Sequence, residues 1–229
     1  MEGDISGQAV DTLSWSDIDC DMRVVRSGTT LVTCESCEMS YLRGPESARH
    51  RRFHDERLKG VPWKPYKAEK VVRDVDELRI VLVDFSCPQF LRKRAAKVGT
   101  HANRETQYKV GVYFPHWSGN EALIGVIDNR AVSILVVKPM HAVWHLTWAQ
   151  YDKGTEPVKV PEAAEQRGCA FLWVLQKHRG DGIARAMANT AVARSGLEKE
   201  HFPWLRPFTP TGERFLRRYC PQRFAMGAV

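Results

Sequence analysis

Short apolar runs separated by polar, breaker-rich segments dominate the chain after residue 78. The β-branched and apolar runs predict strands at 79–85, 108–114, 122–127, 131–137, 141–148 and 169–175. Asp128 and Asn129 are turn residues that predict a hairpin between the third and fourth of these strands. Segments 88–97, 182–193 and 211–218 lack central breakers and predict helices. This alternation favours an α/β (α+β) fold, a mixed sheet flanked by a few helices.

The first third of the chain has a different organisation. Residues 1–28 are rich in Asp, Ser and Gly without a sustained period, which predicts a flexible acidic arm. A strand-like run at 29–33 leads into Cys34, and a helix is expected at 46–58 before Gly60 and Pro62. The predicted division is therefore the arm at 1–28, a small module at 29–62, a linker at 63–77 and the α/β domain at 78–229. Residues 151–166 are expected to form a loop.

Composition narrows the class of protein. With 229 residues and 43% hydrophobic content the chain can build a core, which excludes wholly disordered proteins. No apolar run approaches the ~18 residues of a membrane-spanning helix, and no secretory signal is visible, so a soluble protein without a membrane partner is expected. Six scattered cysteines favour reduced thiols over a disulfide framework.

The net charge of +7 indicates an acidic partner, and its distribution is uneven. The first 30 residues hold six acidic residues and two arginines, whereas residues 43–73 hold ten basic and four acidic residues. Trp63 and Tyr66 interleave with Lys64 and Lys67, a pattern that favours contact with a chromatin component and allows a weak nucleic-acid contact. A solvated helix face is the alternative interpretation.

The strongest single motif combines Cys34, Cys37, His50 and His54. Two cysteines separated by two residues can bind one ion from a tight turn, and histidines four apart lie on one face of a helix. Four protein ligands leave no open coordination position, so the motif predicts a structural Zn²⁺ site of the Cys2His2 zinc-finger type. One finger reads only ~3 base pairs of DNA, so a sequence-specific DNA-binding protein is disfavoured.

A second motif lies where the strand at 169–175 meets the next helix. Glycines in a turn at a helix start allow several backbone N–H groups to face an anion, and the helix dipole favours negative charge there. Gly180 and Gly182 supply this flexibility, and Lys177 and Arg179 add positive charge. The pattern Arg179-x-x-Gly182-x-Ala184 is that of the pyrophosphate turn of GNAT acetyltransferases, whereas the motifs for ATP and NAD binding are absent.

Together, the finger and this turn resemble the sister-chromatid cohesion acetyltransferases, the ESCO family, within the GNAT superfamily. The resemblance covers residues 33–63 and 124–224, with a less certain match at 71–114. It rests on the finger ligands with Met39 and Tyr41, on the turn with Trp173 and Met187, and on a C-terminal block from Thr209 to Cys220 that includes Gly212, Phe215 and Tyr219.

The resemblance implies a GNAT fold that binds acetyl-CoA between splayed strands. The pantetheine arm would pair with Leu172, Trp173 and Val174, and the thioester end would lie near Thr209, Pro210 and Thr211. The pyrophosphate would be held by the turn and the first helical residues, which are Arg179, Gly180, Asp181, Gly182, Ile183, Ala184 and Arg185.

Catalysis by this route needs few side chains. The Val174 N–H is a candidate oxyanion donor, and Tyr219 a candidate acid for the departing thiolate, with aromatic packing as its alternative role. Glu162, Glu165 and His145 are the candidates for the base, and Glu162 is preferred. The family's substrate-handling serine and aspartate are replaced by Ala170 and Pro207, which bears on activity and on the identity of the substrate.

The leading interpretation is a nuclear, acetyl-CoA-dependent lysine N-acetyltransferase acting on a chromosome-associated protein. Family resemblance implies a cohesin subunit as the substrate. A histone acetyltransferase and a catalytically weak GNAT-like chromatin adaptor are the alternatives, and the missing serine and aspartate favour the adaptor.

Overall fold

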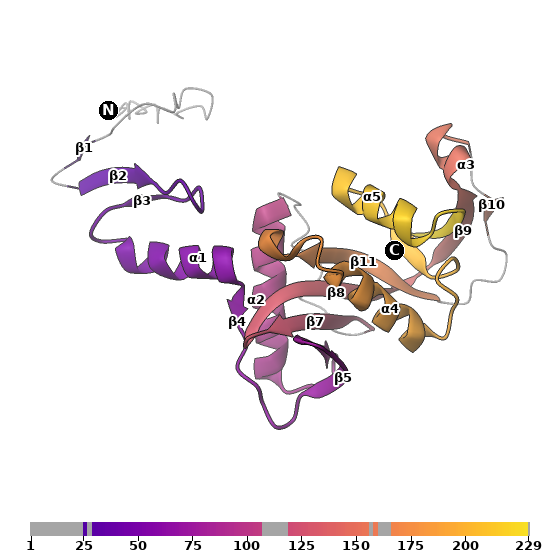
Figure 1. Ribbon diagram of the computed structural model, residues 1–229, viewed down its shortest axis with the longest axis horizontal. Helices are drawn as coiled ribbons and strands as arrows, with labels where there is room; N and C mark the ends of the chain where they lie inside the picture. Colours follow the sequence, from indigo (N-terminus) through magenta and orange to yellow (C-terminus); the bar gives the residue numbers. More distant parts are fainter. Residues whose placement is uncertain (1–24, 27–28, 107–118, 156–157, 160–165, 229) are drawn as a thin grey trace, which may run out of the picture. The chain divides into compact units, whose positions relative to one another are not determined.

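The computed structural model describes residues 25–26, 29–106, 119–155, 158–159 and 166–228 (Figure 1). The chain divides into two compact units, Met1–His54 and Asp55–Val229. None of the helices in the described ranges is both long enough and apolar enough to cross a membrane. The strand predicted at 108–114 lies outside the described residues, as does the arm predicted at 1–28 except for Val25–Arg26, which form a strand paired with residues 29–30.

The first unit contains a small antiparallel sheet and the start of a helix. Its strands are β1 (Val25–Arg26), β2 (Thr29–Thr33) and β3 (Ser40–Leu42), in the order β1-β2-β3. Between β2 and β3 the chain turns tightly, because Glu38 adopts φ +58° and donates its N–H to the Cys34 carbonyl (2.7 Å). Helix α1 (Ser47–Lys59) follows, and the boundary between the units falls within it.

The second unit is built on one mixed sheet flanked by helices. Its long antiparallel part runs β11-β8-β7-β6-β5, and a shorter part continues from β11 as β12-β13-β9-β10, while β4 pairs with β8. The strands are β4 (Val61–Pro62), β5 (Lys70–Val75), β6 (Leu78–Val83), β7 (Glu121–Ile127), β8 (Arg130–Met140), β9 (Ala142–Thr147), β10 (Val158–Lys159), β11 (Gln166–Val174), β12 (Pro203–Leu205) and β13 (Arg223–Ala228). The helices are α2 (Gln89–Thr106), α3 (Trp148–Asp152), the 3₁₀ turn η2 (Gln176–His178), α4 (Ile183–Ser195) and α5 (Pro210–Tyr219).

Helices α2 and α4 cover opposite faces of the long sheet (Figure 1). His101 of α2 contacts the ring of Trp173, which is paired with Ile134. The neighbouring Ser133 points to the other face, where a Cβ added at Gly125 would meet both the Ser133 hydroxyl and Met187 of α4. Because both faces are covered, β7 and β8 are apolar almost throughout, as the sequence pattern predicts.

The predicted hairpin and central helices are confirmed, but several boundaries and strands are corrected. The predicted linker at 63–77 instead contains β5, which pairs with β6, and Trp63 is fully buried with the Arg94 guanidinium 4.2 Å above its ring. The predicted loop at 151–166 contains β10, and the strand predicted at 141–148 ends at Thr147 because that residue caps α3. Strands β12 and β13 were not predicted, because short segments such as Pro203–Leu205 carry no alternation.

Strands β11 and β12 separate almost at once. They are parallel neighbours with a single paired position, Cys169 and Trp204, whereas β11 and β8 are paired from Gln166 to Val174. Next to that position, a Cβ built on Gly168 would lie 2.5 Å from the Pro203 carbonyl oxygen. The absence of a side chain at residue 168 therefore allows the two strands to meet before they diverge.

We expect Gly168→Ala to destabilise the second unit, because its methyl group would push β12 away from β11. Overpacking of this kind costs about 1–3 kcal/mol, and thermal unfolding should show a lower Tm. Gly154→Ala is the control, because its methyl group would meet nothing within 4 Å. It should lower the stability only through the strain of an alanine in a left-handed backbone conformation at φ +65°. A Tm for Gly168→Ala no lower than that of Gly154→Ala would contradict this role of residue 168.

Candidate functional site

The four predicted metal ligands come together within the first unit. The thiols of Cys34 and Cys37 flank the turn after β2, and His50 and His54 lie one turn apart on α1. Their ligand atoms all lie within 4.8 Å of one another. The structure thus brings together the residues that the spacing predicted.

The donor set fits a tetrahedral zinc ion. The Cys34 Sγ lies 3.4 Å from His54 Nδ1, and the Cys37 Sγ lies 3.5 Å from His50 Nε2. Zinc–sulfur and zinc–nitrogen bonds of usual length span an edge of about 3.5 Å in a tetrahedron. The pKa of Cys34 is lowered to about 6, mainly by a hydrogen bond from the Cys37 backbone and to a smaller extent by one from the His50 side chain. The lower pKa favours the thiolate that a metal requires. The Tyr41 ring stacks on His50 at 3.9 Å and holds its orientation.

On the edge of β11 that faces away from β8, two backbone N–H groups have no strand partner within the described residues. Leu175 donates its N–H to the Val132 carbonyl (2.8 Å), and the antiparallel register alternates along the strand. The backbone N–H and C=O of Trp173 therefore point toward β8, whereas the N–H groups of Leu172 and Val174 point toward the opposite edge. Since β12 pairs with β11 only at Cys169, these two amides are open to an extended ligand.

The turn that follows has the conformation of an anion site. Gly180 and Gly182 adopt φ +105° and +82°, and a Cβ added at either would meet nothing within 4 Å. Gly182 is the N-cap of α4, and no side chain caps the helix there. The first intrahelical hydrogen bond runs from the Ala186 N–H to the Gly182 carbonyl (3.0 Å). The N–H groups of Ile183, Ala184 and Arg185 thus lack intrahelical partners at the positive end of a 13-residue helix.

Arg179 does not project into this turn, which corrects its predicted role as a source of positive charge there. Its Nε donates to the Val174 carbonyl (3.0 Å), and its Nη2 forms an ion pair with Glu105 of α2. Arg57 pairs with the other oxygen of the same carboxylate (2.9 Å). The side chain of Arg179 therefore links the end of β11 to α2 and leaves only backbone groups of the turn free to face an anion.

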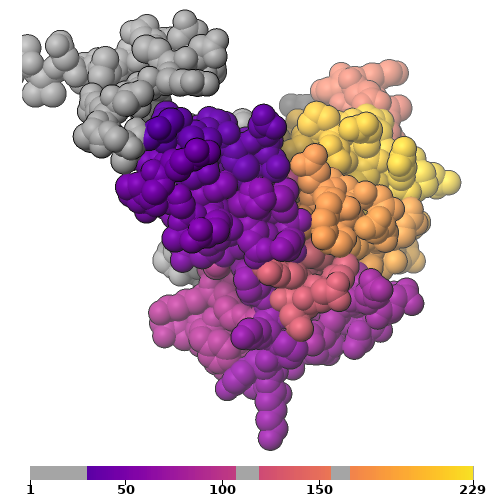
Figure 2. All heavy atoms as spheres, turned by 60° about the vertical axis from the view of Figure 1, so that its left-hand side comes forward, coloured from indigo at the N-terminus to yellow at the C-terminus, as the bar shows by residue number. Residues whose placement is uncertain are grey.

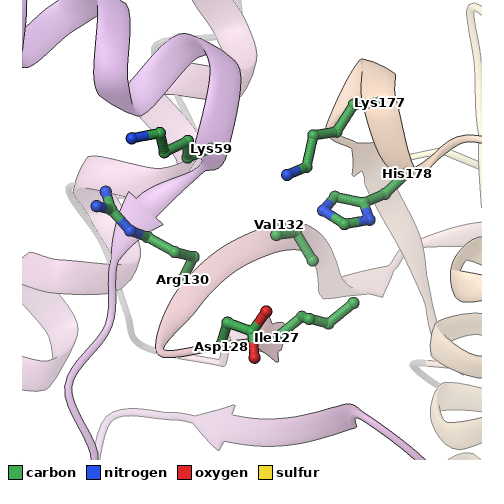
Figure 3. Close-up of a pocket in the computed structure, with 7 residues that line it drawn as sticks. All are labelled: Lys59, Ile127, Asp128, Arg130, Val132, Lys177 and His178. Carbon is green, nitrogen blue, oxygen red and sulfur yellow. The ribbon is translucent and has the colours of Figure 1, made fainter.

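A pocket of about 210 Å³ lies beside the turn but outside the predicted coenzyme residues (Figure 3). Lys177 and His178 point toward it from η2, and Asp128 faces them from the β7–β8 turn, so its charge is mixed. Arg130 turns toward Asp55, to which it donates a hydrogen bond of 2.6 Å. The pocket is lined by Lys59, Ile127, Asp128, Arg130, Val132, Lys177 and His178.

Helix α5 borders the separation of β11 and β12 from the other side. Thr209 caps α5 by accepting a hydrogen bond from the Gly212 N–H (3.1 Å), and Pro210 occupies its first turn. Tyr219 is buried against Trp204 of β12, and its hydroxyl donates to Asn189 Oδ1 of α4 (2.8 Å). Figure 2 shows the orange η2–α4 segment beside the yellow C-terminal segment. Burial raises the pKa of Tyr219 to about 12.

The candidate bases are not equally placed. Glu162 and Glu165 lie outside the described residues. His145 stacks on His201 (4.9 Å), and burial, then His201, lowers its pKa. His145 belongs to β9, which β13 separates from β12, so it does not border the open edge of β11.

Sequence reasoning missed Glu105 and Asn189. Both lie on helices among ordinary polar residues, and no local spacing marks them, because their partners are 74 and 30 residues away.

Comparison with known proteins identifies relatives of one kind. The chain is 26% identical over 208 residues to N-acetyltransferase ESCO2 of Danio rerio, covering 82% of this chain and 34% of that protein. It is 27% identical over 191 residues to N-acetyltransferase ECO1 of Yarrowia lipolytica, covering 78% and 64%. The chain spans about a third of the length of the ESCO2 relatives that it matches. No protein-family model matches it.

A solved structure supports the same conclusion for the fold. The xEco2 acetyltransferase domain bound to a K105-CoA conjugate superimposes with a TM-score of 0.58 at 22% identity, covering 71% of this chain and 99% of that domain. The chain therefore resembles the ESCO and ECO1 N-acetyltransferases and has a GNAT-like fold, so both predictions are confirmed.

We expect the purified chain to carry one zinc ion per molecule, and His54→Ala to lose it because three ligands remain of four. Elemental analysis of the dialysed protein provides the measurement. Cys87→Ala removes a thiol outside the four-residue group and should retain full zinc occupancy. Equal zinc content in the two variants would exclude this metal site.

Proposed function

We propose that this chain is an acetyl-CoA-dependent protein lysine N-acetyltransferase with a structural zinc site. The observation that supports it best is the combination of two backbone features in one place. The open edge of β11 offers amides to an extended arm, and the turn after it offers amides to a diphosphate. Coenzyme A contains both groups in this order.

The residues present fit this coenzyme. Leu172 and Val174 would pair with the pantetheine arm, while Trp173 packs its ring against α2. The diphosphate would lie against the amides from Gly180 to Arg185, where no side chain fills the space above the glycines. The acetyl group would then lie between the end of β11 and the start of α5 at Thr209–Thr211.

The transfer proceeds by attack of a neutral lysine amine on the thioester carbonyl. Free lysine has a pKa of ~10.4, so a base must accept its proton, and Glu162 keeps this proposed role. The Val174 N–H would stabilise the oxyanion as the C–N bond forms. As the C–S bond breaks, Tyr219 would turn its O–H away from Asn189 Oδ1, which accepts that hydrogen in the structure, and give the proton to the thiolate.

For the substrate we propose a cohesin subunit in the nucleus, on the basis of the ESCO and ECO1 relatives. Ala170 and Pro207 stand where that family has its serine and aspartate, so lysine recognition must use other groups here. A histone substrate and a binding-only adaptor remain the alternatives that the experiment below separates.

The basic residues at 49–70 and 92–97, which we predict to form a basic face, are only partly available to a partner. Arg57, Arg94 and Lys97 are engaged by Glu105, Glu69 and Glu56 respectively. Lys64, Lys67 and Lys93 remain exposed, and Trp63 is buried rather than interleaved with them. A weak nucleic-acid contact through these lysines stays a prediction.

Two matched glycine variants test the coenzyme site. Gly182→Glu places a carboxylate where the diphosphate should bind and should weaken acetyl-CoA binding in calorimetry at least tenfold, about 1.4 kcal/mol. Gly196→Glu is the control, because Gly196 has a similar φ (+71°), equally open surroundings and a place at the other end of the same helix. Equal affinities in the two variants would contradict the site.

Labelled acetyl-CoA with either cohesin or nucleosomes identifies the acceptor in the same preparation. Label on a cohesin subunit supports the proposal, and label on histones alone supports the alternative enzyme. Binding of acetyl-CoA without any transfer would indicate the adaptor.

We expect Tyr219→Phe to lower kcat by about 10²-fold or more, the usual contribution of a general acid, while the KM for acetyl-CoA changes little. Because the pKa of Tyr219 is about 12, its acid form persists across the working range, and its titration should not limit the rate below about pH 10. Tyr151→Phe serves as the control in a steady-state assay. An unchanged kcat in Tyr219→Phe would assign Tyr219 a packing role only.

A further inference from the structure

Glu105 is a buried carboxylate held between two arginines at the end of α2. Its side chain is 6% exposed, and its two oxygens pair with Arg57 and Arg179. Burying a carboxylate costs free energy that is recovered only when good partners are present, so such a group requires an explanation beyond surface solvation.

The partner that matters for the coenzyme is Arg179. Its Nε donates to the Val174 carbonyl, and its Nη2 pairs with Glu105, so one planar guanidinium bridges β11 and α2. Arg179 also stands immediately before Gly180, where the anion-binding turn begins. Its position therefore sets the spacing between the Val174 amide and the amides at the start of α4.

We propose that Glu105 is a positioning residue for acetyl-CoA. By holding Arg179, Glu105 fixes the open edge of β11 and the turn relative to each other before the coenzyme binds. The binding free energy is then not reduced by the entropy cost of ordering these two segments. This inference rests on the proposed function, because it concerns the affinity of the same site.

The sign of the effect separates positioning from simple electrostatics. Glu105→Gln removes one negative charge near an anionic ligand. The reduced Coulomb repulsion alone would therefore predict tighter binding of acetyl-CoA. Loss of preorganisation predicts weaker binding. We expect the Kd and KM for acetyl-CoA to rise about tenfold (about 1.4 kcal/mol), with kcat at saturation unchanged within twofold.

The matched control is Glu69→Gln. Glu69 is likewise buried, with a 3% exposed side chain, and lies between two arginines, Arg79 and Arg94, but makes no contact with the turn. Its loss should lower the Tm without changing the Kd for acetyl-CoA. A Kd raised equally in both variants would show that general loosening, rather than positioning, is responsible.

Calorimetry and steady-state kinetics on the full chain give distinct outcomes. If the unmodified chain fails to bind acetyl-CoA, the proposed function fails. If it binds and Glu105→Gln binds equally well or more tightly, the positioning role is overturned and the proposed function stands. Should Glu105→Gln not fold, Arg179→Lys keeps the charge but cannot bridge both acceptors, and an unchanged Kd there would overturn the proposal in the same way.

Discussion

The early separation of β12 from β11 is the constraint on which the rest of the site depends. Backbone N–H groups are obligatory hydrogen-bonding groups, and a strand edge without a neighbour must find another partner. On the side of β8 every position of β11 from Phe171 to Val174 is paired, whereas on the other side the pairing stops at Cys169. The opening is therefore bordered by oriented amides, and helices α4 and α5 flank it. A preorganised edge of this kind binds an extended ligand without rearrangement of the chain.

Several basic side chains stabilise the fold through internal contacts, whereas the basic composition suggests that they bind an acidic partner. The arginine of the turn faces Val174 and Glu105, and several other cations are engaged in internal ion pairs. In the proposed site, the anion would therefore be bound by the amides at the start of α4 and by the helix dipole, which act at fixed positions. This division of roles accounts for a turn that tolerates Asp181 beside its glycines, because binding there depends on backbone geometry rather than on net charge.

The candidate metal site and the proposed coenzyme site differ in how they are assembled. The four candidate metal ligands come from one turn and one helix, so two local spacings are enough to bring them together. The coenzyme site combines the end of β11, the start of α4 and the start of α5, and two of its supporting contacts, Arg179–Glu105 and Tyr219–Asn189, join residues far apart in the chain.

The sequence alone determined the candidate metal-binding group, the central hairpin, the glycine turn and the GNAT-like resemblance. These are properties of neighbouring residues, because spacing, turn chemistry and hydrophobic periodicity act over a few positions. Tertiary structure alone decided that residues 63–77 carry an edge strand, that Pro203–Leu205 and Arg223–Ala228 join the sheet, and that Arg179 is paired with Glu105. Short strands and buried ion pairs are stabilised by partners distant in sequence, and no local pattern records which partner the fold will bring to them.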